Sequence, residues 1–375
     1  MMHIKMVDLQ GQYLRIKNEI DAAIQEVLLS TGFIQGEQVK NFAAHLSSYN
    51  QGAHVVPCGN GTDALQIAMM ALELKPGDEV ILPVHTYVAT AEVIALLGLT
   101  PVFTEVDEET FNIDPKQVEE KITDKTKAIV PVHLYGQCAD MTPLLKIAQT
   151  YNLYVIEDLA QAIGATYTFP NGENKMAGTM GHVGCTSFFP SKNLGAYGDG
   201  GAILTTDKIL AEKMQMICNH GQRVKYHHDV IGVNSRLDTL QAAILDVKLK
   251  YLDDYTHRRN LVAGFYDKQL QSVPFIKIPV RAANSTHAFH QYTLRTVGIN
   301  RDHFKKYLEE KGIPTMIYYP VPLHLQKAYR RDGFGEGSFP VTEKLSQTVI
   351  SLPIHTEMTT DELSYICDSI KSYHG

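Results

Sequence analysis

One lysine stands where covalent chemistry is possible, in a turn between an aromatic run and a glycine-rich loop. Lys192 lies within the segment TSFFPSKNLGAYGDGG, residues 186–201. Upstream, Asp158 ends the apolar run VIED, residues 155–158. Pyridoxal phosphate chemistry needs such a pair, because the lysine forms a Schiff base with the cofactor aldehyde and the acid keeps the pyridine nitrogen protonated. The pair therefore predicts an enzyme that uses pyridoxal 5'-phosphate.

Both residues also have an ordinary interpretation. A lone lysine is by default an exposed loop residue, and Asp158 could simply cap a helix that begins at Leu159. The neighbours favour the catalytic interpretation, since the Ser187 hydroxyl could bind a phosphate and the following glycines let the backbone approach a ligand closely. Gln161, one turn after Asp158, could donate a hydrogen bond to the phenolic oxygen of the cofactor.

Two turns further upstream offer contacts to the same cofactor. The turn GNGT, residues 59–62, lies between a strand and a helix, where backbone N–H groups and the Thr62 hydroxyl suit a phosphate monoester. Tyr87 follows another strand and could stack on a flat heteroaromatic ring. On local grounds alone, the turn could equally be a plain helix cap and Tyr87 a packing residue.

Alternating strands and helices are expected to position these residues. Apolar runs predict strands at residues 55–56, 79–83, 100–104, 127–132 and 154–157. Periodic apolar spacing predicts helices at residues 16–30, 37–49, 63–74, 89–97, 141–151 and 237–251. This alternation is typical of an α/β fold with a largely parallel sheet, in which ligands bind at the carboxyl ends of the strands. We expect a large domain over residues 1–249 and a smaller one over residues 250–375.

The composition excludes several other classes of function. The chain has 375 residues, of which 44% are hydrophobic and 20% charged, so it can bury a substantial core. Its net charge of −7 argues against nucleic acid and anionic membranes as partners, because no basic excess is available to neutralise phosphates. No apolar run approaches the roughly 20 residues that span a bilayer. The N-terminus lacks the apolar core of a signal peptide.

Cysteine and histidine patterns point to a cytoplasmic protein without a metal site. The five cysteines are widely spaced and include no CxxC pair, which favours free thiols in a reducing compartment. Among the 16 histidines, His227 and His228 are sequence neighbours, and no HExxH spacing accompanies them. We therefore expect no bound metal.

Four motifs in a fixed order carry a resemblance to a known family. They are GT at 61–62, DLAQ at 158–161, SFFPSK at 187–192 and GVNSRLD at 232–238. Together they resemble the DegT/DnrJ family of sugar-nucleotide aminotransferases, and the similarity runs from about Val7 to Met358. The resemblance implies the aspartate aminotransferase fold, known as fold type I, with a mostly parallel central sheet and a smaller C-terminal α+β domain.

The resemblance also implies a role for each motif residue. Lys192 would be the Schiff-base lysine, Asp158 would pair with the pyridine nitrogen, and Tyr87 would stack on the ring. The residues that would hold the phosphate are Gly61, Thr62, Ser187 and, from the neighbouring subunit, Asn234. A homodimer is therefore part of the expected active site. The residues that match regions near the sugar nucleotide are His228, Tyr318, Tyr319 and His324.

The family pattern narrows the reaction. Lys192 favours transamination, because family members that dehydrate sugars carry histidine at that position. Gln161 and the run from Gly337 to Pro353 resemble aminotransferases that act at C3 of dTDP-3-keto-6-deoxyhexoses, with glutamate as the expected donor. The alternatives are a UDP- or GDP-linked keto sugar, a dehydratase of the same fold, an amino-acid aminotransferase, and a PLP-binding regulator without turnover.

Overall fold

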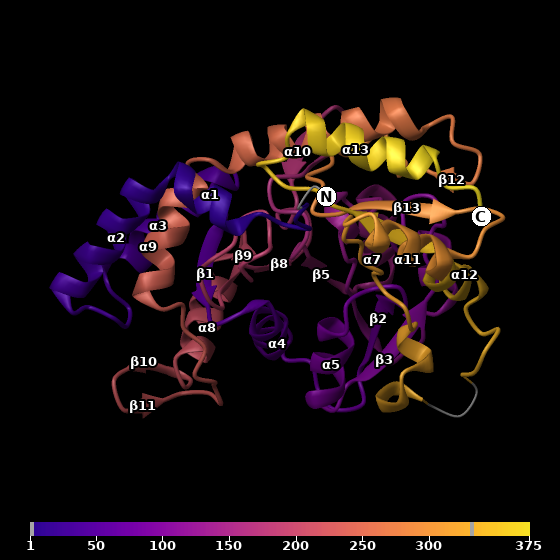
Figure 1. Ribbon diagram of the computed structural model, residues 1–375. Coiled ribbons are helices and arrows are strands. Elements are labelled where there is room, and N and C mark those ends of the chain that lie inside the picture. The colour runs from indigo at the N-terminus through magenta and orange to yellow at the C-terminus, as the bar shows by residue number, and fades with distance from the viewer. Residues whose placement is uncertain (1–3, 331–333) are drawn as a thin grey trace.

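A seven-stranded sheet forms the centre of the molecule. The structure is a computed structural model that describes residues 4–330 and 334–375 (Figure 1). The strand order is β1-β9-β8-β5-β4-β2-β3. Strand β9 pairs antiparallel with both β1 and β8, and the other neighbours pair parallel. The strands are β1 His54–Cys58, β2 Glu79–Pro83, β3 Thr100–Thr104, β4 Thr126–Ile129, β5 Tyr154–Asp158, β8 Val183–Ser187 and β9 Gly201–Thr205.

Helices cover both faces of this sheet, and this explains why its strands are apolar runs in the sequence. In β2, Val80 and Leu82 pack on one face, and Ile81 between them packs on the other. Successive strand residues point to opposite faces, which is why every position must be apolar when both faces are buried. The first face is covered by α4 Gly61–Ala71, α5 Ala89–Leu96 and α8 Lys208–Cys218. The second is covered by α6 Pro115–Glu120 and α7 Met141–Tyr151.

Helices that precede β1 and a helix that follows β9 in the sequence form an arm at one side of the molecule. The arm contains α1 Leu9–Arg15, α2 Lys17–Ser30, α3 Glu37–Tyr49 and α9 Thr239–Leu249 (Figure 1). Phe42 and Leu46 of α3 are fully buried against Leu245 of α9. Below the arm in this view projects a hairpin of β10 Gln222–Val224 and β11 His227–His228.

The C-terminal part builds a second, smaller core. Its sheet has the order β12-β13-β14, and all of its pairings are antiparallel. Tyr266, Tyr292 and Phe304 are fully buried in this core. Helices α10 and α13 lie side by side over it (Figure 1). The elements are α10 Leu252–Leu270, β12 Ile276–Lys277, β13 Tyr292–Thr296, α11 Arg301–Glu310, α12 Pro340–Thr348, β14 Val349–Leu352 and α13 Thr360–Lys371.

Short elements connect these layers. A small hairpin of β6 and β7 flanks the large sheet, and the loops among the described residues include three single turns of 3₁₀ helix. Their bounds are β6 Thr166–Thr168, β7 Asn174–Met176, η1 Leu134–Gly136, η2 Leu323–Leu325 and η3 Lys327–Tyr329.

The α/β fold with a mostly parallel sheet and a smaller α+β part is as predicted. The predicted elements appear with shifts of a few residues at their ends. The sequence did not predict the strands after residue 158 or the helices after residue 251, nor did it predict α1, α6 and α8. None of the described helices is both long and apolar enough to cross a bilayer. The five cysteines are free and buried.

Candidate active site

A cavity of about 510 Å³ opens at the carboxyl ends of β2, β5 and β8. Parallel strands bring their carboxyl ends to one edge of the sheet, which is where α/β proteins bind ligands. Residues from both parts of the chain line it. The predicted residues among them are Gly61, Thr62, Tyr87, Asp158, Gln161, Ser187, Lys192, Tyr318 and Tyr319.

Lys192 reaches this cavity from a tightly closed loop between β8 and β9. The Phe188 N–H donates to the Gly200 carbonyl and the Ala196 N–H donates to the Phe188 carbonyl, both at 2.7 Å. The Lys192 N–H donates to the Phe189 carbonyl at 2.8 Å, so the lysine backbone is held as well. Burial lowers the pKa of the Lys192 amine to about 8, against an opposing pull from the charge of Asp158.

Asp158 ends β5 and is buried at the floor of the cavity. The Thr90 hydroxyl donates to one of its oxygens at 3.0 Å, and the Ala160 N–H donates to the other at 3.1 Å. Burial raises the pKa of Asp158, and these hydrogen bonds together with the Lys192 charge offset only part of that shift. A buried carboxylate of this kind is stabilised by a cation. The protonated pyridine nitrogen of pyridoxal phosphate is a suitable one.

The amino end of helix α4 forms an anion cradle beside Lys192. Asn60 caps the helix by accepting the Asp63 N–H at 2.8 Å, which leaves the N–H groups of the first turn facing the cavity. A Cβ on Gly61 would lie 2.7 Å from the Cβ of Ser187, so only glycine fits between the helix and β8. The cradle therefore places Gly61, Thr62 and Ser187 around a space suited to a phosphate.

Aromatic residues form the opposite wall. Tyr87 is 58% exposed, and its ring centroid lies 6.1 Å from that of Tyr319. The Gln161 amide donates to the Tyr319 hydroxyl at 3.2 Å. Burial raises the pKa of both Tyr318 and Tyr319, so both hydroxyls stay neutral. This wall offers neutral hydrogen-bonding groups and ring faces.

Three predicted residues lie away from the cavity of their own protomer. Asn234 and His228 are exposed, and the His228 Nδ1–H donates to the His220 carbonyl at 2.8 Å. His324 is fully buried and its Nε2 lies 3.0 Å from a Glu343 carboxylate oxygen. The roles predicted for these three residues stay predictions.

The structure adds residues that no sequence motif had indicated. Thr90 bonds to Asp158, although the two lie far apart in the chain. His290 and Gln291 line the cavity from the segment before β13, and both are buried. Thr90 lies on α5, where the sequence predicts only a helix and gives no sign of a functional residue. His290 lies in a region of the sequence without clear periodicity. Only the fold brings them to the site.

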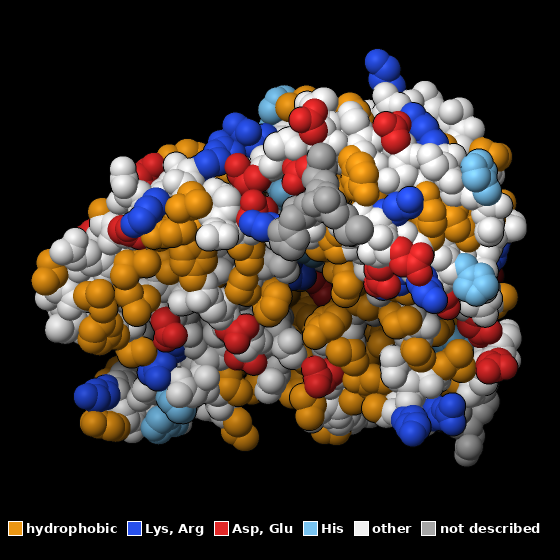
Figure 2. All heavy atoms as spheres, in the orientation of Figure 1, with side chains coloured by type: hydrophobic (Ala, Val, Ile, Leu, Met, Phe, Trp, Pro, Cys, Tyr) orange, Lys and Arg blue, Asp and Glu red, His pale blue; other side chains and the backbone are white. Residues whose placement is uncertain are grey.

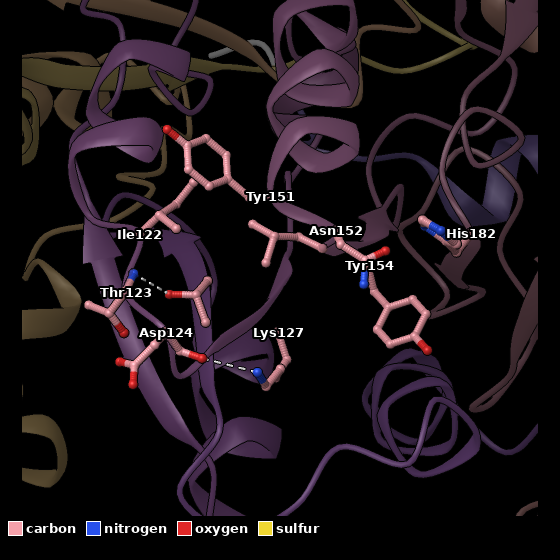
Figure 3. Close-up of a pocket in the computed structure, with 10 residues that line it drawn as sticks. Ile122, Thr123, Asp124, Lys127, Tyr151, Asn152, Tyr154 and His182 are labelled. Carbon is pink, nitrogen blue, oxygen red and sulfur yellow. Dashed lines mark hydrogen bonds between the residues drawn. The ribbon is translucent and has the colours of Figure 1, made fainter.

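A second hollow, of about 690 Å³, lies at the other edge of the sheet, where β4 and β5 begin (Figure 3). Its lining includes Tyr151, Tyr154 and His182. The Lys127 ammonium there is bonded to the Asp124 carbonyl at 3.1 Å. Although larger, this hollow lacks the pairing of a lysine of lowered pKa with a buried carboxylate that marks the first cavity.

The donors around the first cavity fit pyridoxal phosphate, and comparison with known proteins agrees. A lysine, a buried acid and a helix amino end correspond to the aldehyde, the ring nitrogen and the phosphate of that cofactor. The fold and the site are those of a PLP-dependent aminotransferase. The chain belongs to the DegT/DnrJ/EryC1/StrS aminotransferase family, which it matches over residues 14–371.

Curated relatives of full length carry several names. A "pleiotropic regulatory protein" of Geobacillus stearothermophilus is 46% identical and covers 100% of this chain and 99% of its own. UDP-2-acetamido-2-deoxy-3-oxo-D-glucuronate aminotransferase of Pseudomonas aeruginosa is 45% identical, covering 98% and 99%. dTDP-3-amino-3,6-dideoxy-alpha-D-galactopyranose transaminase of Aneurinibacillus thermoaerophilus is 44% identical, covering 99% of both chains.

Solved structures agree with these relatives. DesV of S. venezuelae, solved in complex with a ketimine intermediate, has a TM-score of 0.95 at 40% identity, and the match covers 99% of this chain and 98% of that one. Other structural neighbours were solved with pyridoxamine phosphate or in a PLP form. The chain is therefore a PLP-dependent sugar-nucleotide aminotransferase.

Proposed function

We propose that this enzyme transfers the amino group of L-glutamate to C3 of a dTDP-linked 3-keto-6-deoxyhexose. The observation that carries the proposal is the pairing of Lys192 with Asp158 in one cavity beside a neutral aromatic wall. Gln161 and the 44% identity to a dTDP-sugar 3-transaminase support the choice of sugar. The 45% identity to a UDP-sugar aminotransferase makes UDP-linked 3-keto sugars the first alternative.

In this proposal Lys192 is the proton carrier. Bound pyridoxal phosphate supplies an electron sink that makes the α-hydrogen of an amino acid removable as a proton. The Lys192 amine can take that proton at Nζ, because its pKa of about 8 leaves an appreciable neutral fraction near neutral pH. In the second half of the cycle the same Nζ returns a proton to C3 of the sugar. Lys192 therefore serves both halves from one position.

Asp158 and the helix cradle would hold and polarise the cofactor. The Asp158 carboxylate would pair with the ring nitrogen and would stabilise its protonated form. Thr90 and the Ala160 N–H keep that carboxylate oriented. Gly61, Thr62 and Ser187 would bind the phosphate, and Tyr87 would cover the ring.

We also propose a homodimer in which Asn234 completes the neighbouring subunit's phosphate site. Within the described ranges, Lys192 is the only lysine or arginine that lines the cavity, which leaves phosphate charge to be met from elsewhere. Exposed apolar side chains gather over the arm (Figure 2), and others lie on the nearby hairpin and directly after it. They include Leu29, Ile34, Tyr226 and Ile231, which are 51–87% exposed. Burial of such a surface favours association.

The spatial division of labour follows the same proposal. Residues 1–249 would form the cofactor domain, and residues 250–375 the smaller domain that contributes Tyr318 and Tyr319. The enzyme would work in the cytoplasm, a compartment that keeps free thiols such as these five reduced.

Absorbance of the protein with pyridoxal phosphate tests the reaction. Glutamate should convert the visible band of the bound cofactor to the near-ultraviolet band of pyridoxamine phosphate, and a dTDP-linked 3-keto-6-deoxyhexose should restore the visible band. Lys192→Ala should do neither. Restoration by a UDP-linked 3-keto sugar alone would replace the proposed substrate, and no conversion by any amino donor would favour a regulator without turnover.

Mixing two inactive variants tests the shared site. A hybrid dimer of Lys192→Ala and Asn234→Ala has one site in which both residues are intact only if Asn234 acts across the interface. Random mixing of subunits should then restore about a quarter of the sites. Each variant alone serves as the control. Mixtures that stay inactive, although co-purification through a tag on one variant shows that subunits have exchanged, would place Asn234 outside the neighbour's site.

A further inference from the structure

Tyr135 lies directly behind the aromatic wall of the cavity without lining it. It belongs to the turn η1, which follows β4, and only 2% of its surface is exposed. Its backbone has φ +58°, a left-handed conformation that is rare for a bulky residue. Strain of this kind persists only where surrounding contacts hold it, and it gathers at functional sites.

Those contacts lead to three separate segments of the cavity lining. The Tyr135 N–H donates to the Gln161 side-chain oxygen at 2.7 Å. The Tyr135 carbonyl accepts the Gln291 N–H at 3.2 Å. The Tyr135 hydroxyl donates to the Tyr318 carbonyl. One residue thus joins the segment after β5, the segment before β13 and the Tyr318–Tyr319 wall.

The hydroxyl also receives a hydrogen bond from the cofactor side of the cavity. His85 Nε2 lies 3.2 Å from the Tyr135 hydroxyl oxygen. The single hydroxyl hydrogen goes to the Tyr318 carbonyl, so His85 must be the donor at Nε2. Burial lowers the pKa of His85 to about 4, so the ring is neutral. His85 stands two residues before Tyr87, which would cover the cofactor ring.

The Tyr135 backbone acts on the second wall tyrosine as well. Because the Gln161 oxygen accepts the Tyr135 N–H, the Gln161 NH₂ group faces the other way, toward Tyr319. Its hydrogen bond to the Tyr319 hydroxyl is 3.2 Å long. Tyr318 is therefore held through the Tyr135 side chain, and Tyr319 through its backbone.

We propose that Tyr135 is a positioning residue that sets the Tyr318–Tyr319 wall against the cofactor-side loop His85–Tyr87 and so determines how tightly the nucleotide sugar binds. The inference rests on the proposed function, with the nucleotide sugar bound against this wall. Tyr135 acts through other residues and does not touch the reacting atoms.

Tyr135→Phe isolates the hydroxyl, because the phenylalanine keeps the ring and the backbone hydrogen bond to Gln161. Tyr266→Phe is the matched control, since the Tyr266 hydroxyl is equally buried and donates to the Pro353 carbonyl at 2.9 Å, in the second core. We expect Tyr135→Phe to raise KM for the dTDP-linked keto sugar about tenfold, as loss of one buried hydrogen bond allows. The kcat and the glutamate half-reaction should stay close to wild type.

Binding and structure give readouts that do not depend on turnover. The affinity for a dTDP-linked 3-amino sugar, measured by calorimetry, should fall about as much as KM rises. His85→Phe should reproduce the effect, and combining it with Tyr135→Phe should add little, because both changes break one chain of hydrogen bonds. A crystal structure of Tyr135→Phe should show the Tyr318 carbonyl displaced.

Failure of the proposed function and failure of the inference about Tyr135 give different experimental results. A wild-type enzyme that aminates no dTDP-linked sugar contradicts the proposed substrate. The Tyr318 carbonyl position in Tyr135→Phe then still decides the inference. An unmoved carbonyl overturns it, as does a Tyr135→Phe enzyme whose KM matches that of Tyr266→Phe. Equal losses in both half-reactions would also overturn it, because they indicate general destabilisation.

Discussion

Asp158 shows how burial can prepare a single side chain to bind a cationic ligand. Burial opposes its charge, and two hydrogen bonds relieve that opposition only in part. The protein therefore holds a carboxylate that destabilises the fold at neutral pH and that, in the proposed function, binding of a cationic ring would stabilise. The contribution of Asp158 to function is therefore the difference in electrostatic energy between the carboxylate alone and the carboxylate beside the cationic ring.

Asp158→Asn should separate the two effects. Without cofactor, the variant should unfold at a higher temperature than wild type at pH 7, because the buried carboxylate is removed. The folded pKa of Asp158 lies above its unfolded value of 3.8, so the penalty appears as pH rises through the folded pKa. The gain should vanish below pH 3.8. Thermal melts over that pH range measure it.

The same variant should lose activity. Loss of an electrostatic stabiliser of this kind slows the chemical step by roughly 10²–10³-fold, measured as the rate of the glutamate half-reaction. Thr90→Val is the companion change, since it removes one hydrogen bond and keeps the charge, and its loss should be much smaller. Equal losses in the two variants would assign the effect to orientation of Asp158 and not to its charge.

Much of the site was predictable at this scale because each motif keeps its chemistry within a few residues. Lys192, Ser187 and Asp158 stand beside strand ends, and strand ends meet at one edge. Thr90 and Tyr135 were not predictable, because their roles are contacts to residues far away in the chain. His324 matched a family position, yet the structure pairs it with Glu343 outside the cavity.

At the scale of elements, the junction of α4 and β8 sets the space that we propose for the phosphate. Gly61 lets the helix end approach Ser187, and a methyl group there would meet the Ser187 Cβ at 2.7 Å. Helix and strand would have to separate, and the N–H groups of the cradle would move with the helix. The cradle thus depends on one missing side chain.

Gly61→Ala should weaken binding of pyridoxal phosphate by about tenfold or more, since displaced N–H groups lose part of their attraction for the phosphate. Equilibrium dialysis of the protein against the cofactor measures this. Gly264→Ala on α10 is the control, because nothing lies within 4 Å of its added Cβ. It should stabilise the fold by up to about 1 kcal/mol and leave affinity unchanged. Unchanged affinity in Gly61→Ala would remove the helix end from the phosphate site.

Strands were predictable where both faces are apolar and helices where spacing is regular. Residues 79–83 and 100–104 form β2 and β3 as predicted, since continuous apolar runs suit a sheet covered on both faces. Strand β8, with the sequence VGCTS, escaped prediction because Gly184 and two polar residues interrupt its pattern. A Cβ on Gly184 would lie 2.3 Å from the Gly178 carbonyl oxygen, so packing and not propensity selects that glycine. The long helix α10 escaped because its buried face includes Arg259.

At the scale of the whole molecule, buried neutral histidines tie stability to pH. Burial lowers the pKa of His287 to about 3 and of His85 to about 4. Both folded values lie below the unfolded value of 6.5, so unfolding takes up protons as pH falls. Their contribution to stability is complete above pH 6.5 and is lost as pH falls toward 4.

The protein should therefore become markedly less stable between pH 6.5 and pH 4, by up to about 1.4 kcal/mol per unit of pKa shift for each histidine. Denaturant titrations at both pH values give the free energy of unfolding. His287→Gln should flatten the dependence, because glutamine does not take up a proton. An equal slope in wild type and variant would assign the acid sensitivity to other groups.

The five cysteine thiols should be unreactive in the folded molecule. All are buried, and burial raises the pKa of Cys138, Cys218 and Cys367 to about 12 and those of Cys58 and Cys185 well above the usual 9.0. A thiol must ionise and be reached before it reacts with an oxidant or an alkylating reagent. The native protein should thus resist Ellman's reagent. The rate at which colour appears then measures how fast the folded structure opens and exposes the thiols. Because the cysteines lie in both cores, mass spectrometry of the labelled peptides would show which core opens first.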